Sequence, residues 1–299
     1  MRFVIAGAGG VGGNLGVRLI EAGHDVAWLA RGANLSALRR AVVLESPLGD
    51  ARLGAQHAEE DAARLPAPDA IVVAVKMYSL AELAPKLAPL TRRDTLVLPL
   101  QNGIEAHSTL AAALPGAKIL KGMVSVKARL KAPAAIECKS GFCRVRLGGE
   151  GAEVLAAALR TGKGVEAAVS SQIDADLWRK FVMLTGFSAV SCLTRATIGQ
   201  VLGDAQAYRQ LLQAVEEAVQ VAHAIGVELS ADVEQLVQSQ VRDLPREGKP
   251  SMLEDLEAGR ALELDYLSGS VVRLGERYGI ATPFHAMACR LLAMHSKGT

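Results

Sequence analysis

The sequence lacks the features by which several classes of protein bind their partners. Only 4% of its residues are aromatic, and 33 lysines and arginines nearly balance 31 acidic residues. Nucleic-acid binding usually relies on a basic surface or on aromatic stacking platforms, so we expect no nucleic-acid partner. The longest mostly apolar stretch, residues 181–193, is interrupted by polar residues and is too short to span a bilayer. We therefore expect no membrane partner either.

Patterns typical of metal sites and of hydrolases are also missing. The four cysteines show no CxxC spacing, the six histidines show no HExxH pattern, and no Gly-x-Ser-x-Gly elbow occurs. Metal-dependent and serine-dependent hydrolysis are therefore not supported, and we expect no metal. Such cysteines are typical of reduced cytosolic thiols, and we expect no secretory leader. Together these observations predict a soluble, cytoplasmic protein.

What the sequence does contain is a nucleotide-binding pattern at its start. A strand pattern at residues 2–6 leads into a Gly-x-Gly-x-x-Gly turn, a helical pattern at residues 14–22 and a second strand pattern at residues 25–30. In such a unit the glycines allow a tight turn, close approach of a pyrophosphate, and close packing of helix and strand. We favour a dinucleotide site over a glycine-rich turn without a ligand, because the strand and the helix stand where the motif requires them. The predicted cofactor contacts are Gly7, Ala8, Gly9, Gly10, Val11 and Gly12.

The end of the second strand bears on the choice of cofactor. An NAD site usually has an Asp or Glu there for the ribose 2′-hydroxyl, whereas an NADP site accommodates the 2′-phosphate with an Arg. The strand here ends in Leu29-Ala30-Arg31, without a carboxylate. Arg31 has a simpler interpretation as a surface arginine, but its permanently charged guanidinium suits a phosphate. We predict NADPH/NADP+ as the cofactor.

Strand and helix patterns alternate through the first half of the chain, which predicts an α/β fold with a Rossmann-type, doubly wound sheet. Further strand patterns at residues 69–75 and 95–100 are followed by helical patterns at residues 79–90 and 104–114. Lys76 and Asn102 follow these two strands, at the carboxyl ends where such sheets bind ligands. We expect them to line one crevice with the glycine turn.

The pattern changes in the second half of the chain. Residues 136–147 form two short strand patterns around Ser140-Gly141, which predicts a hairpin. From residue 171 onward the apolar residues recur with helical spacing. A chain of 299 residues also exceeds the usual size of a single core. We predict a Rossmann domain at residues 1–170 and an all-α domain at residues 171–299.

Lys180 is a candidate acid in the helical part. Leu177, Met183, Leu184 and Phe187 lie on its face of the predicted helix, which places its ammonium group among apolar side chains. Desolvation lowers the pKa of a lysine towards neutrality, where it can act as a general acid. Taken alone, the pattern favours a lysine whose stem packs while its charge reaches water.

Two further polar residues have both a structural and a functional interpretation. Ser251 with Glu254 fits a capping box, which is the simpler explanation of the serine. Glu263, between two leucines, is either a first-turn helix carboxylate or an inward-facing partner of Lys180. Spacing alone does not decide between these interpretations.

Taken together, these motifs resemble the ketopantoate reductase (2-dehydropantoate 2-reductase) family over almost the whole chain. The resemblance implies a Rossmann domain joined to a helical domain, with the active site in the cleft between them. It also implies reduction of ketopantoate, a 2-oxo acid, to the 2-hydroxy acid pantoate by NADPH. The segments that carry it are GAGGVG at Gly7–Gly12, Arg31, AVK at Ala74–Lys76, QNG at Gln101–Gly103, LWRKF at Leu177–Phe181 and PSMLEDLEAGRALELDYLSG at Pro250–Gly269.

The resemblance also implies roles for individual residues. Lys180 is then the general acid that protonates the carbonyl oxygen, and Glu263 is the carboxylate that orients lysine and substrate. Asn102 and Ser251 are then substrate hydrogen-bonding groups, beside Lys180 and Glu263. Contacts to the cofactor are then expected from Arg31, Lys76 and Asn102.

The chain departs from the family at two positions. Family members that make pantoate typically carry asparagines where this chain has Leu184 and Ser188. Loss of an amide that bonds a substrate hydroxyl changes discrimination between substrates. Reduction of a different 2-oxo acid or ketone, a polyol-phosphate or opine-type dehydrogenase, and an NADP(H)-binding sensor without turnover stay open as alternatives. A homodimer also stays open, because the long helices beyond residue 205 have the length to pack on a partner subunit.

Overall fold

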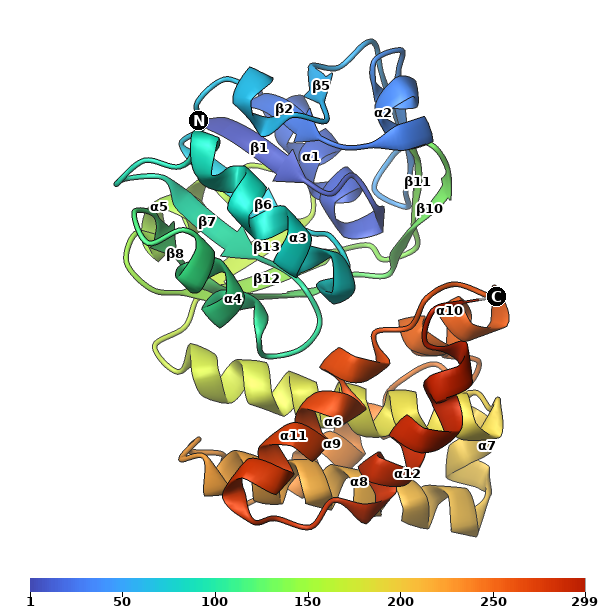
Figure 1. Ribbon diagram of the computed structural model, residues 1–299. Coiled ribbons are helices and arrows are strands. Elements are labelled where there is room, and N and C mark those ends of the chain that lie inside the picture. Colours follow the sequence, from blue (N-terminus) through green and yellow to red (C-terminus); the bar gives the residue numbers. More distant parts are fainter. Residues whose placement is uncertain (299) are drawn as a thin grey trace. The chain divides into compact units, whose positions relative to one another are not determined.

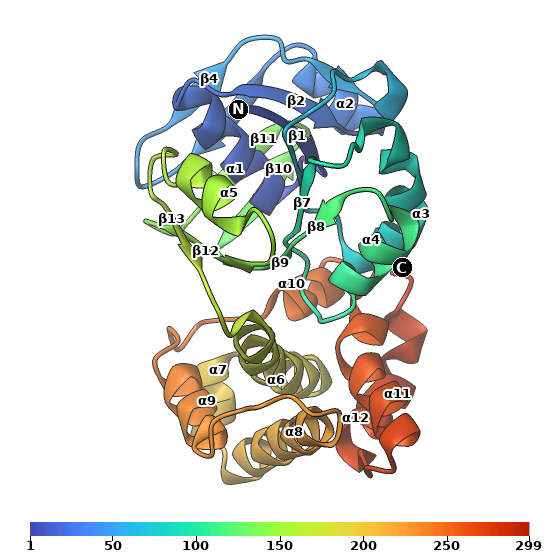
Figure 2. The same ribbon diagram turned by 90° about the vertical axis from the view of Figure 1, so that its left-hand side faces the viewer.

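The computed structural model describes residues 1–298, which form two compact units (Figure 1 and Figure 2). The first unit comprises Met1–Gln101 and Glu105–Ile173 and is built on β-sheets. The second comprises Asn102–Ile104 and the chain from Asp174 onward and is helical. Asn102–Ile104 follows a strand of the first unit in sequence, yet it groups with the helices of the second.

The first unit is organised around a six-stranded sheet with the order β5-β2-β1-β6-β7-β8, in which all neighbours run parallel. The central strands β6 and β7 are buried along their whole length, which explains their continuous apolar sequences. The order reverses at β1, and this confirms the predicted doubly wound sheet. The strands are β1 (Arg2–Ala6), β2 (Asp25–Leu29), β5 (Ala58–Glu59), β6 (Ala70–Val73), β7 (Leu96–Pro99) and β8 (Lys118–Ile119).

Helices connect these strands, but the one expected over residues 79–90 is not continuous. It is divided into η2 (Met77–Ser79), α3 (Leu80–Leu83) and η3 (Ala84–Leu90), of which only α3 is α-helical. Pro85 and Pro89 lie in the last part, and a proline has no amide hydrogen to donate to the preceding turn. The other helical elements of the unit are α1 (Gly10–Glu21), α2 (Gly32–Leu38), η1 (Ala62–Arg64), α4 (Ala106–Ala113) and α5 (Ala152–Leu159).

Two smaller sheets complete the first unit, and they show that the predicted hairpin around Ser140-Gly141 is wrong. The strand before it, β11 (Ala135–Cys138), pairs with β10 (Ala128–Ala132) and with β3 (Val42–Glu45). The strand after it, β12 (Cys143–Gly148), pairs instead with β9 (Lys121–Ser125) and β13 (Val165–Val169). Apolar alternation identifies a strand but not its partner, which distant segments supply. The remaining strand, β4 (Ala51–Leu53), pairs antiparallel with β3.

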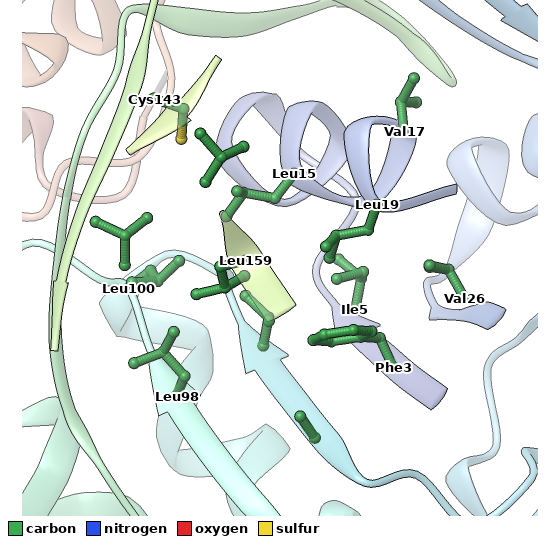
Figure 3. Close-up of a cluster of buried hydrophobic side chains, with 14 of the residues drawn as sticks. Phe3, Ile5, Leu15, Val17, Leu19, Val26, Leu98, Leu100, Cys143 and Leu159 are labelled. Carbon is green, nitrogen blue, oxygen red and sulfur yellow. The ribbon is translucent and has the colours of Figure 1, made fainter. Parts of the chain in front are cut away.

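The core of the first unit lies between α1, the parallel sheet and the small sheets (Figure 3). Phe3 and Ile5 of β1 and Leu15 and Leu19 of α1 are completely buried, and Leu98 of β7 is part of the same cluster. Each fully buried Leu, Ile or Phe side chain contributes about 1.5–3 kcal/mol relative to an exposed one. This packing fixes the start of α1 against the carboxyl end of β1, which is where the glycine turn lies.

The second unit is entirely helical, and α8 lies beside α11 and α12 in both views (Figure 1 and Figure 2). Its short helix α7 was not predicted from the sequence. This helix begins with a capping box between Thr197 and Gln200. No helix of residues 1–298 is long and apolar enough to cross a membrane. The helices are α6 (Ile173–Thr194), α7 (Ile198–Gly203), α8 (Ala205–Ala224), α9 (Val233–Arg242), α10 (Ser251–Glu257), η4 (Leu264–Tyr266), α11 (Ser268–Tyr278), α12 (Pro283–Leu292) and η5 (Ala293–His295).

Buried polar groups join three of these helices. The carboxylate of Glu217 in α8 accepts hydrogen bonds from the backbone N–H groups of Phe284 and His285, at 2.8 and 3.1 Å. The His285 ring contacts Ser268 Oγ through Nδ1 at 3.1 Å and Ala214 O through Nε2 at 2.9 Å. Because a carbonyl oxygen only accepts, we assign the hydrogen to Nε2. Burial lowers the pKa of His285 to about 4, so the ring is neutral at neutral pH.

Candidate functional site

At two positions of the glycine turn after β1, the backbone leaves no room for a side chain without strain. Gly7 has φ +106°, and a Cβ atom there would lie 2.7 Å from Val75 N. A Cβ atom on Gly12 would lie 2.1 Å from Gly7 O, inside the packing of α1 on the turn. Gly7 N also donates to Leu29 O at 3.1 Å, which ties the turn to β2. These contacts bring the turn close to both neighbouring strands.

Gly9 differs from these two glycines because it faces open space. A Cβ atom on Gly9 would have no heavy atom within 4 Å. Gly9 is the N-cap of α1, no side chain of residues 1–298 caps this helix end, and its first turn holds no acidic residue. Free N–H groups at a helix N-terminus bind anions, and phosphates in particular. The turn therefore fits the pyrophosphate of a dinucleotide.

A cavity of about 290 Å³ adjoins the turn at the carboxyl end of β2. Its lining combines apolar side chains with two cations, Arg31 and Lys86. Arg31 lies two residues after the end of β2, where the sequence predicts a phosphate contact. The lining residues are Gly7, Ala8, Leu29, Ala30, Arg31, Asn34, Glu60, Val75, Ser79, Glu82, Leu83 and Lys86.

Asn34 is a residue of this site that the sequence analysis missed. Its Nδ2 donates to Ala8 O at 2.9 Å, and its Oδ1 accepts from Ala134 N at 2.7 Å. The side chain thus links the glycine turn to the tight turn between β10 and β11, where Ala134 has φ +54°. Nothing in the local sequence marks Asn34, because one of its partners lies 100 residues along the chain.

Lys76 follows β6 and is the N-cap of η2. Since β6 lies beside β1 and parallel to it, Lys76 and the glycine turn are at the same edge of the sheet. The side chain is partly buried, and it is not among the residues that line the cavity. Nearby, Gln101 Nε2 donates to Val73 O at 3.1 Å, while its buried Oε1 has no hydrogen-bond partner in residues 1–298.

In the second unit, Lys180 of α6 is brought to Asn102. Its Nζ donates to Asn102 Oδ1 at 3.2 Å, although the two residues are 78 positions apart. Burial lowers the pKa of Lys180 to about 8, and the negative charge of Glu263 acts in the opposite direction. This shift agrees with the desolvated lysine, the interpretation that the sequence pattern taken alone did not favour. A lysine with this pKa is mostly protonated at neutral pH and is a much stronger acid than an exposed lysine.

The sequence left two interpretations of Glu263 open, and in the structure this side chain faces inward. It immediately precedes η4, and only 3% of its surface is exposed. A buried carboxylate requires compensating charge or hydrogen bonds. The charge of Lys180 is one such compensation, because the two groups interact electrostatically.

Ser251 does not form the capping box that its spacing with Glu254 favours. The N-cap of α10 is Pro250, and Ser251 is the first residue of the helix, with no side-chain hydrogen bond to the helix end. The serine is exposed, so its hydroxyl is free of the local structural role. Within residues 1–298 it makes no hydrogen bond to Lys180, Asn102 or Glu263, so the structure brings together three of the four predicted substrate contacts.

The two positions that depart from the family pattern have different environments. Leu184, one turn after Lys180, is partly buried and packs against the core of the helical unit. Ser188, a further turn along α6, is completely buried, and its Oγ has no partner among the described residues. Residues 1–298 contain no group of three His, Cys, Asp or Glu side chains that could hold a metal ion.

Comparison with known proteins adds independent evidence on the family of this chain. The family model described as Ketopantoate reductase PanE/ApbA matches residues 3–148, and the model of its C-terminal part matches residues 172–296. A 2-dehydropantoate 2-reductase of Archaeoglobus fulgidus is 31% identical, over 93% of this chain and 92% of that protein.

Solved structures show that the fold of this chain is also that of ketopantoate reductases. A PanE/ApbA family ketopantoate reductase from Ralstonia eutropha superposes with a TM-score of 0.91 at 27% identity, covering 99% of this chain and 98% of that one. D-mandelate dehydrogenase with NADH and anilino(oxo)acetate has a TM-score of 0.89 at 23% identity, covering 99% and 98% of the two chains. The second similarity is one of fold alone.

Proposed function

Because the chain belongs to the ketopantoate reductase PanE/ApbA family, we propose that it reduces a small 2-oxo acid to the 2-hydroxy acid with NADPH. The observation that carries the proposal is the group formed by Lys180, Asn102 and Glu263. It presents an ammonium group of lowered pKa, held by an amide and accompanied by a buried carboxylate. The reduced nicotinamide, when bound, supplies a hydride to the carbonyl carbon.

Lys180 is the general acid of the proposed reaction. As the carbonyl carbon is reduced, negative charge develops on the carbonyl oxygen, and Nζ donates its proton there. With a pKa of about 8, the ammonium group is largely protonated before the reaction and gives up the proton at low energetic cost. The positive charge of Nζ also stabilises the developing oxyanion before the proton moves.

Asn102 and Glu263 position the acid and the substrate. Asn102 Oδ1 accepts from Nζ, so the amide N–H groups of the same side chain point elsewhere and can donate to a carboxylate or carbonyl of the substrate. Glu263 keeps Lys180 protonated, because its negative charge favours the ammonium form. The exposed hydroxyl of Ser251 is the proposed further donor to the substrate carboxylate.

The first unit supplies the proposed cofactor contacts. The backbone of residues 7–12 and the free N-terminus of α1 hold the pyrophosphate. Arg31, at the cavity beyond β2, faces the adenosine end and pairs with a 2′-phosphate. Lys76, at the same edge of the sheet as the turn, is the proposed second cationic contact.

Ketopantoate is the first substrate to test, and a less hydroxylated 2-oxo acid is the second candidate. Leu184 favours the second candidate, because an apolar side chain one turn from Lys180 offers no hydrogen bond to a substrate hydroxyl. Related enzymes of this fold also include D-mandelate dehydrogenase, whose name denotes an aromatic 2-hydroxy acid. The substrate panel should therefore contain aliphatic and aromatic compounds.

The test is oxidation of NADPH, followed by its absorbance, with ketopantoate, pyruvate, 2-oxoisovalerate and benzoylformate. We expect turnover with at least one of these acids, and the ratio of kcat/KM values identifies the preferred side chain. Tight binding of NADPH without oxidation by any acid in the panel would contradict the proposal and favour the non-catalytic sensor.

A further inference from the structure

One carboxylate in the cavity beside the glycine turn is shared by two cations. Glu82 Oε1 lies 2.5 Å from Lys86 Nζ, and Glu82 Oε2 lies 3.9 Å from Arg31 Nη1. Glu82 and Lys86 come from α3 and η3, whereas Arg31 follows β2, so separate segments converge on this point. All three side chains line the cavity.

These ion pairs can rearrange at little energetic cost. The three side chains are 69%, 62% and 59% exposed for Arg31, Glu82 and Lys86, and water and salt screen exposed pairs of this kind, so that they contribute little to stability. The two cations hold the pKa of Glu82 below its usual value, so the carboxylate is charged at neutral pH. A more highly charged anion that enters the cavity can therefore take over both cations.

The two nicotinamide cofactors differ at the position that such an anion would occupy. NADPH carries a 2′-phosphate there, for which Arg31 and Lys86 are suitable partners and Glu82 is a repulsive neighbour. NADH carries a 2′-hydroxyl instead, and a carboxylate is the group that usually accepts its hydrogen bond. The Glu82 carboxylate thus disfavours the binding of NADPH and favours the binding of NADH.

We propose that Glu82 sets the balance between NADPH and NADH in this protein, and that Lys86 is a cation of the 2′-phosphate site beside Arg31. This inference rests on the proposed function, because it assumes that a nicotinamide dinucleotide binds at the glycine turn. In the free protein Glu82 takes the place of the phosphate on both cations. On binding of NADPH, the phosphate displaces it from them.

The test is the dissociation constant of each cofactor, measured by cofactor fluorescence for the wild type and for Glu82→Gln and Lys86→Gln. Glu82→Gln should tighten NADPH binding by about two- to fivefold and leave NADH unchanged or weaker. Lys86→Gln should weaken NADPH binding by a similar factor with little effect on NADH. Competition by 2′-AMP, but not by 5′-AMP, should follow the NADPH values, because only 2′-AMP carries the phosphate in question.

A matched control is Glu45→Gln, which breaks an exposed ion pair with Lys131 outside the cavity. It should leave both constants unchanged. If Glu82→Gln changes both cofactors by the same factor, or neither, while the wild type binds them, this inference is wrong and the proposed function is unaffected. If the wild type binds neither cofactor, the proposed function fails together with it.

Discussion

The two units of this protein form their sites from different parts of the chain. In the first unit the backbone of one contiguous segment, residues 7–12, forms the proposed nucleotide-binding turn. In the second unit side chains from three distant segments, around Asn102, Lys180 and Glu263, form the proposed acid group. A site made of backbone is sensitive to added volume, whereas a site made of charged side chains is sensitive to charge and pH. The predictions that follow test this contrast.

The largest effect is expected from Lys180→Ala. Without the acid, kcat should fall by about a hundred- to ten-thousandfold, because the developing oxyanion has no proton donor. The dissociation constant of NADPH should change little, since the proposed cofactor contacts are mainly in the other unit. Steady-state kinetics with the best acid of the panel, together with cofactor titration, measure both quantities. Turnover at the wild-type rate would remove Lys180 from the mechanism.

Acid should destabilise the helical unit through His285. The folded state lowers the pKa of His285 to about 4, while the unfolded chain has the ordinary value of 6.5. The unfolded state thus binds more protons between these values, so the stabilisation is complete above pH 6.5 and is lost as the pH falls towards 4. The full loss is on the order of 3 kcal/mol. Burial raises the pKa of the neighbouring Glu217, so protonation of this carboxyl group as the pH falls has the opposite effect and favours the folded state.

The two tryptophans allow this loss to be assigned to one unit. Trp28 is buried in the core of the first unit and Trp178 in that of the second. In a Trp28→Phe variant, denaturant unfolding followed by Trp178 fluorescence should give a lower midpoint at about pH 4.5 than at about pH 7. Replacing His285 with asparagine should flatten this pH dependence. A pH dependence of the same size with His285 and with asparagine at this position would contradict the assignment to His285.

Alanine substitutions in the glycine turn should separate its folding role from its binding role. Gly12→Ala places a methyl group against the backbone of Gly7 and should lower the free energy of unfolding by about 1–3 kcal/mol. Gly9→Ala meets no atom within 4 Å, so stability should be kept. Its methyl group occupies the space where a pyrophosphate approaches, and NADPH binding should weaken by about tenfold. Equal losses of stability in the two variants would contradict this distinction.

The smallest effect concerns the pH profile of the reaction. The acid must be protonated, so kcat/KM should be constant at lower pH and should fall as the pH rises through about 8. Glu263→Gln removes the negative charge that raises the pKa of Lys180, so the inflection should move to lower pH. A merely structural role of Glu263 would lower kcat/KM at every pH and leave the inflection in place.

Whether a feature could be predicted from the sequence depends on how far apart in the chain its residues lie. The glycine turn and the parallel strands follow from neighbouring residues, and both were predicted. The pairing of β11 and β12 in different sheets was not, because strand alternation carries no information about the partner. The break of the helix after α3 was marked by Pro85 and Pro89, so the sequence contained that signal. Asn34 carried no such signal.

The sequence by itself determined which backbone conformations are possible, and with them the glycine turn, the buried parallel strands and the helical second half. These depend on sterics and periodicity among residues close in the chain. Only the tertiary structure decided that Asn102 meets Lys180, that Glu263 is buried, and that Glu82 occupies two cations of the cavity. Charge and hydrogen bonding act through space at a few ångströms, and the folding of distant segments sets which groups come within that range.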